Sequence, residues 1–244
     1  MVEKLWMLKL PLNIKIFIRR ACYDWIPTLE SLAQRNIVVD DKCPICKRAS
    51  ETTLYALRDC KIFRYAHFDW LHRTVVGGRL FSNFFDLIRD CLTRMSTNEL
   101  ELFCVSSWRI WCSRNSIIHD NVHRCNLDVG CWSRNYITQL QTMAIYRGFI
   151  FSRDCGLTLC ILESDAETVV KRITDGCSMD ANSVAILASI ASLLDRSVVN
   201  NIPKKANRAT FGLAKNAMSI NEDLYWLKDF PGCIRSLVEA KKLI

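Results

Sequence analysis

The sequence lacks both a long hydrophobic run and a secretory signal. Its longest apolar stretch, Val184–Leu194, is interrupted by Ser189 and Ser192 and is too short to span a bilayer. The N-terminus, VEKLWMLKL, alternates charged and bulky residues and has no apolar signal core. We therefore expect an intracellular protein, in the nucleus or the cytoplasm, with no membrane partner.

A disulfide framework is not expected either. The chain has 13 cysteines, an odd number, and inside a cell most of them would be reduced thiols or metal ligands. Hydrophobic residues (50%) and charged residues (24%) are in globular proportion, and 244 residues can form one large domain or two small ones. The net charge of +8 is compatible with a polyanionic partner without demonstrating one.

Apolar residues at helical spacing dominate the N-terminal half. They predict an amphipathic helix over 12–25, a short helix over 29–35 capped by Thr28, and further helices around 80–92 and within 98–116. Such stripes are typical of helices that pack on a shared core, so this half is predicted to be all-helical.

A pair of cysteines at zinc-knuckle spacing interrupts these helices. Cys43 and Cys46 form a C-x2-C pair, a spacing at which a turn points two thiolates at one zinc ion, and Cys60 can supply a third. A closed tetrahedral site needs a fourth ligand. The place to look for it is Tyr55, and tyrosine is a poor zinc ligand. We therefore expect zinc to be bound weakly or not at all.

Few histidines stand where they could replace Tyr55 as the fourth zinc ligand. His67 and His72 follow Cys60, and they are either replacement ligands or ordinary surface or packing residues. His119 and His123 are four positions apart, but no acidic residue or cysteine stands at a fitting distance from them. We assign no metal site to that second pair.

Three motifs follow one another in a fixed order across about residues 4–70. They are W-x-L-x-L-P-x-x-I-K-I-F-x-x-R over 6–20, C-P-x-C over 43–46, and E-T-T-L-x-A-L-x-D-C over 51–60. This order and spacing resembles the zinc-binding region that follows reverse transcriptase in LINE-type, non-LTR retrotransposons of plants. The resemblance implies zinc and nucleic-acid binding. The family has histidine where this chain has Tyr55, so the implied ligand set is incomplete.

The motif W-x-I-W-x-x-R-N over 108–115 is similar to the one that ends the helical region of the same family. Its aromatic and arginine side chains could stack on a nucleic-acid base or pack in the core, and packing is the commoner outcome. The resemblance places a zinc-binding-like helical region at 1–116. Residues 117–136 show no clear hydrophobic period and are predicted to be a linker.

Helices and short strands alternate after the linker. The pattern predicts a helix over 140–156, a strand over 157–162, a helix over 166–174, a helix around 186–194, a strand over 198–202 and a helix over 207–217. This order resembles the second half of an RNase H type-1 domain. The three antiparallel strands that begin that fold are missing, because a short linker cannot supply them. The resemblance gives a truncated RNase H-like region at 137–220 and a C-terminal tail at 221–244.

Asp165 stands where the first of these strands ends and a helix begins. Carboxylates at this place in an open sheet often bind metals or catalyse, and they also often cap the helix. In the RNase H family four acidic or histidine positions hold two Mg²⁺ ions. Here only Asp165 remains, since the first position falls in the missing strands and Gln141 and Phe211 stand at two others. The resemblance therefore implies that magnesium is not bound and that RNA–DNA hybrids are not cleaved.

Four basic residues gather near the last strand and helix: Lys204, Lys205, Arg208 and Lys215. They could contact phosphate or form a solvated face. The predicted fold class is α+β, an all-helical zinc-knuckle-like region plus a truncated RNase H-like region with two parallel strands. The predicted function is retroelement-derived binding of an RNA–DNA hybrid or a single strand, without catalysis. The alternatives are a zinc-dependent interaction module and a remnant with no selected role.

Overall fold

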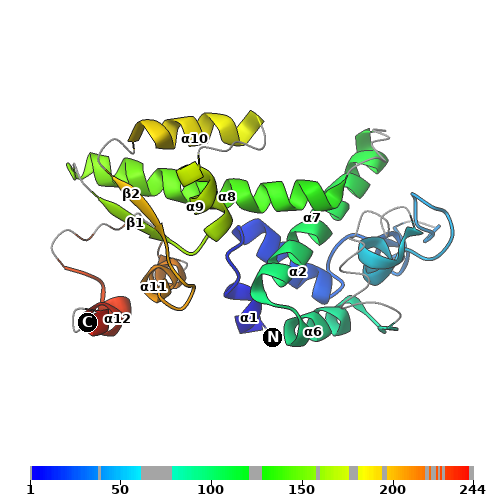
Figure 1. Cartoon of the computed structure of the whole chain (residues 1–244). Coiled ribbons are helices and arrows are strands. Elements are labelled where there is room, and N and C mark those ends of the chain that lie inside the picture. Colours follow the sequence, from blue (N-terminus) through cyan, green and yellow to red (C-terminus); the bar gives the residue numbers. More distant parts are fainter. Residues whose placement is uncertain are drawn as a thin grey trace. The chain divides into compact units, whose positions relative to one another are not determined.

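The protein consists of two compact units, Met1–Tyr136 and Ile137–Ile244 (Figure 1). The computed structural model describes residues 2–37, 40–61, 79–120, 128–157, 160–175, 181–193, 197–217, 220, 224, 226 and 229–241. None of the helices in these ranges is both long enough and apolar enough to cross a membrane.

The described part of the first unit is mostly helical. Its elements are α1 (Val2–Trp6), α2 (Leu12–Cys22), α3 (Leu29–Ala33), the π-helix η1 (Tyr55–Asp59), α6 (Phe84–Arg94), α7 (Thr97–Asp120) and the first turns of α8 (Val129–Asp154). Helix α2 packs against α6 and α7. Ile14 and Ile18 recur at helical spacing on its buried face, and Leu87 and Ile110 come from its two neighbours. The predicted all-helical core is thus present.

Side-chain caps set where two of these helices begin. The Thr28 hydroxyl accepts a hydrogen bond from the Ser31 amide, as predicted. The Asn83 side chain accepts one from the Asp86 amide at 2.9 Å and starts α6 at Phe84. The predicted stripe began at Leu80, and that start was wrong, because Leu80 precedes the cap and is 99% exposed.

The predicted irregular linker over 117–136 is helical wherever the structure describes it, apart from the residue before α8. Residues 117–120 end α7, and 129–136 begin α8. The aromatic rings of Trp132 and Tyr136 lie 6.1 and 5.9 Å from that of Trp108, centroid to centroid. This helical start is thus packed on α7 through aromatic contacts that hydrophobic spacing along the chain does not reveal.

The second unit contains two parallel strands. Strand β1 (Ile161–Ser164) pairs with β2 (Val198–Asn201), with Leu162 opposite Val199. The other elements are the rest of α8, α9 (Glu167–Asp175), α10 (Ala181–Leu193), α11 (Arg208–Ala217), η3 (Gly232–Ile234) and α12 (Arg235–Lys241). The predicted fold class, mostly helical with a two-stranded parallel sheet, is confirmed.

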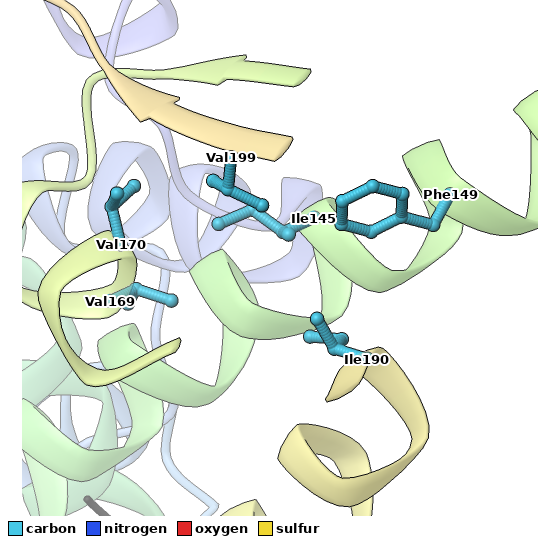
Figure 2. Packing of buried hydrophobic residues seen from close by; sticks show 6 residues of the cluster. All are labelled: Ile145, Phe149, Val169, Val170, Ile190 and Val199. Carbon is cyan, nitrogen blue, oxygen red and sulfur yellow. The ribbon is translucent and has the colours of Figure 1, made fainter. Parts of the chain in front are cut away.

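One face of this sheet is buried under helices. Figure 2 shows side chains from α8, α9, α10 and β2 meeting in one cluster: Ile145, Phe149, Val169, Val170, Ile190 and Val199. On the strands burial alternates with the pleat, since Val199 is buried whereas Ile161 and Val198 are 68% and 52% exposed. The sheet therefore has an uncovered, partly apolar face among the described residues.

Strand β1 begins later than predicted, at Ile161 instead of Leu157. The residues before it close the end of α8, because the Gly156 amide donates to the Arg153 carbonyl and the Leu157 amide to the Ser152 carbonyl. Gly156 has a φ of 73°, the left-handed conformation that ends many helices and favours glycine. Leu157 therefore belongs to the helix cap.

Candidate metal centre

A tight hairpin carries Cys43 and Cys46. It is closed by an antiparallel bridge between Lys42 and Ser50 and by a 2.8 Å hydrogen bond from the Cys43 amide to the Ala49 carbonyl. The Lys47 amide donates to the Cys43 carbonyl at 2.9 Å, and Lys47 has a φ of 57°. This left-handed residue reverses the chain just after the second cysteine, which leaves both thiols on the inside of the turn.

The π-helix η1 supplies the rest of the site. The Thr52 hydroxyl accepts from the Tyr55 amide at 2.9 Å, and the Cys60 amide donates to the Tyr55 carbonyl at 2.8 Å. The i→i+5 hydrogen bond of a π-helix therefore holds Cys60 next to Tyr55 across this turn. In an α-helix, residues five apart would point in different directions. This local geometry brings both side chains to the hairpin.

The three predicted thiols converge. The sulfurs of Cys43, Cys46 and Cys60 all lie within 4.8 Å of one another, and those of Cys43 and Cys60 are 3.8 Å apart. In a tetrahedral zinc site with Zn–S bonds of about 2.3 Å, two sulfurs lie about 3.8 Å apart. The thiol arrangement therefore fits one zinc ion. Within the described ranges, no other set of three cysteine, histidine or acidic side chains comes this close together.

The surroundings favour a thiolate at Cys43. The hydrogen bond between the Cys43 and Cys60 side chains is the largest of the causes that shift the pKa of Cys43, which is lowered to about 6. Hydrogen bonds with the Cys46 and Ile45 amides and with the Cys46 side chain lower it further, and burial opposes the shift. Thiolate is the form that binds metal. At neutral pH the hairpin therefore already presents the buried Cys43 sulfur in the metal-binding form.

Tyr55 lies against this cluster. Its hydroxyl oxygen is 3.1 Å from the Cys46 sulfur, within hydrogen-bonding distance. The hydrogen bond to Cys46, burial, and the charges of all three cysteines raise the pKa of Tyr55 well above its usual value. Without a metal ion the phenol is therefore neutral and can donate to the Cys46 sulfur.

Histidine does not complete the site in the described part of the chain. His67, His72 and His123 lie outside the described residues. His119 is in the last turn of α7 and belongs to no set of three close ligands in the described ranges. Among the described residues, Tyr55 lies beside the sulfurs at the place where the motif spacing put the fourth ligand position.

A buried ion pair connects the hairpin to two helices. The Glu51 carboxylate, fully buried, accepts from the Arg114 guanidinium, with an Nε–Oε1 distance of 2.9 Å, and from the Leu29 amide at the start of α3. The Arg114 guanidinium also lies 4.7 Å from the ring centre of Trp111. Of the two roles considered for the W-x-I-W-x-x-R-N motif, this geometry favours packing, since Arg114 is 4% exposed. Sequence reasoning missed Glu51 as the partner.

Asp165 has a different kind of neighbour. The Asn207 side-chain amide donates to the Asp165 carboxylate at 2.8 Å, across the gap between the end of β1 and the start of α11. In the described ranges Asp165 is in no set of three close metal-ligand side chains, and Glu163 is exposed. Asn207 is a contact that sequence reasoning missed, because it is 42 residues from Asp165 in the sequence.

The predicted phosphate-binding residues lie near Asn207, between the end of β2 and α11. Lys204 and Lys205 are exposed in the turn after β2, and Arg208 is exposed at the start of α11. Lys215 belongs to α11, and its side chain lies outside the described ones. Phosphate binding by these residues stays a prediction.

Comparison with known proteins supports the zinc-binding interpretation of the first unit. A family model described as zinc-binding in reverse transcriptase matches residues 1–66, a range that contains all three thiols and Tyr55. The match supports a retroelement-derived protein with a zinc-binding region. No curated protein and no solved structure matches the chain. The RNase H resemblance of the second unit and the plant source stay predictions.

Proposed function

We propose that this chain is a retroelement-derived, nucleic-acid-binding protein whose first unit is organised by one zinc ion on Cys43, Cys46 and Cys60. The observation that carries the proposal is the convergence of these sulfurs at zinc-site spacing inside the segment that matches the zinc-binding family. When bound, zinc supplies a fixed cross-link between the hairpin and η1. The protein's own contribution is the hairpin turn and the π-helix that aim the thiols.

The second unit is, in this proposal, an RNase H-like remnant without magnesium or hydrolysis. It comprises 137–220, followed by a tail over 221–244, and joins the zinc-binding-like region of 1–116 through the stretch over 117–136. Two Mg²⁺ ions need several carboxylates that converge. Asp165 instead accepts from a neutral amide, and no acidic pair joins it in the described ranges. An intracellular location in the nucleus or cytoplasm belongs to the same proposal.

Nucleic-acid binding tests the proposal directly. We expect the zinc-loaded full chain to retain RNA–DNA hybrid and single-stranded probes in a filter-binding assay, with affinity that falls as salt rises, because phosphate binding releases counterions. Replacing Lys204, Lys205 and Arg208 together by alanine should reduce the slope of log affinity against log salt by about 2 to 3, since each charge that binds a phosphate contributes about one. Lys171→Ala, an exposed charge on α9, is the matched control.

Two outcomes would decide against phosphate binding there. A triple variant with the salt slope of the wild type would show that the three residues form only a solvated face. Zinc-loaded protein that retains no probe at low salt would favour the interaction module over nucleic-acid binding.

Hydrolysis is the second test. In magnesium-containing buffer, we expect an RNA–DNA hybrid incubated with the full chain to be cleaved no faster than in buffer alone, because a single carboxylate cannot position two metal ions. Asp165→Asn should behave identically. Cleavage by the wild type that disappears in Asp165→Asn would show that the second unit is a working nuclease.

A further inference from the structure

A phenol oxygen lies beside the three-sulfur cluster, in contact with Cys46. The Tyr55 hydroxyl lies 3.1 Å from the Cys46 sulfur, which itself lies within 4.8 Å of the Cys43 and Cys60 sulfurs. Tyr55 is held there by the backbone, since its amide and carbonyl both take part in hydrogen bonds that shape η1. The phenol is thus a built part of the cluster.

The distance from the Tyr55 oxygen to the Cys46 sulfur is close to that between two ligand atoms of one zinc ion. With Zn–S bonds of about 2.3 Å and Zn–O bonds of about 2.0–2.2 Å, an oxygen in a tetrahedral site lies about 3.5 Å from each sulfur. The Tyr55 oxygen would need to move by about 0.4 Å relative to Cys46, which a small side-chain rotation provides.

We propose that Tyr55 is the fourth zinc ligand and that its oxygen completes a three-sulfur, one-oxygen site. This inference rests on the zinc site proposed above. On binding, the phenol and any protonated thiols release their protons to water, zinc forms one bond to each donor atom, and no atom is oxidised or reduced. A bound Zn²⁺ is the largest charge in the site and reverses the effect of the thiolates on the phenol.

The cost of this ligand is a weaker site than histidine would give. A phenol must lose a proton that neutral imidazole does not carry on its ligating nitrogen, so binding competes with that protonation. Three thiolates and a phenolate also leave excess negative charge around the ion. Lys42, Lys47 and Arg48 in the same hairpin offset part of it. The site is therefore complete but more easily emptied than one with imidazole.

A zinc titration of the full chain distinguishes this ligand from a water molecule. The proteins are the wild type, Tyr55→Phe, Tyr55→His and the control Tyr23→Phe, which removes an exposed hydroxyl on another segment. We expect zinc to produce a tyrosinate absorption band in the wild type and the control but in neither Tyr55 variant. By chelator competition, Tyr55→Phe should bind zinc at least about tenfold more weakly than the wild type, and Tyr55→His more tightly.

Failure of this inference and failure of the zinc site would look different. Equal affinities of wild type and Tyr55→Phe, with no tyrosinate band, would overturn the Tyr55 ligand while leaving the three-thiolate site intact. Zinc binding by Tyr55→His alone would overturn both the Tyr55 ligand and the zinc site of the wild type. If none of the four proteins binds zinc, the zinc site of the proposed function is itself wrong, and Tyr55 is not a zinc ligand.

Discussion

Arg114→Met should destabilise the first unit by about 3–5 kcal/mol, the cost of leaving one partner of a buried ion pair without the other. The Glu51 carboxylate is fully buried and shares two hydrogen bonds with the Arg114 guanidinium. Removing the guanidinium leaves that charge in a water-excluded site. Urea unfolding followed by tryptophan fluorescence, with hydrogen exchange to assign the transition to the first unit, measures the loss.

Two further variants separate the charge from the packing. Glu51→Gln with Arg114→Met removes both charges and keeps an acceptor for the Leu29 amide, so most of the lost stability should return. Arg89→Met breaks an exposed pair with Asp86 and should cost less than about 1 kcal/mol. If Arg114→Met were no worse than Arg89→Met, the ion pair would not be what joins the hairpin to α3 and α7.

Removing zinc should loosen the first unit and leave the second unchanged. A bound metal stabilises the folded state by mass action, by about 2.7 kcal/mol when free zinc is about 100 times its dissociation constant. The effect should be local because all three thiols belong to the first unit. In hydrogen exchange, a chelator should speed the exchange of amides in the hairpin and η1 but not that of amides in α9 and β2.

The control for zinc removal is a protein that cannot hold the ion. Cys60→Ser should show the deprotected pattern without chelator and respond little to it. Cys131→Ser changes an exposed thiol away from the cluster and should behave as the wild type does. A chelator that deprotects both units equally, or neither, would contradict a zinc-organised first unit.

Much of the fold and the thiol set followed from local patterns. The apolar spacing of α2 predicted its buried face, and apolar runs followed by helices predicted two parallel strands. The C-x2-C pair and Cys60 predicted the sulfurs that the structure brings together. These features depend on residues close in sequence, or on a spacing whose geometry is known in advance.

The remaining features depend on distant contacts or on rare backbone geometry. Glu51 and Arg114 meet only after α3, the hairpin and α7 have packed, so the sequence near either residue does not predict the pair. A π-helix is uncommon, and its i→i+5 hydrogen bond is what brings Cys60 next to Tyr55. Asn207 reaches Asp165 through the order of the parallel strands. The two side-chain pairs thus depend on tertiary packing, and the π-helix depends on a backbone geometry that apolar spacing does not reveal.

The metal content of the full chain tests the central claim most directly. Native mass spectrometry of protein purified without chelator should show one zinc ion per chain in the wild type and in Cys131→Ser, and none in Cys60→Ser. Wild-type protein that carries no zinc after incubation with excess zinc, or Cys60→Ser that retains a full equivalent, would contradict a site built on Cys43, Cys46 and Cys60.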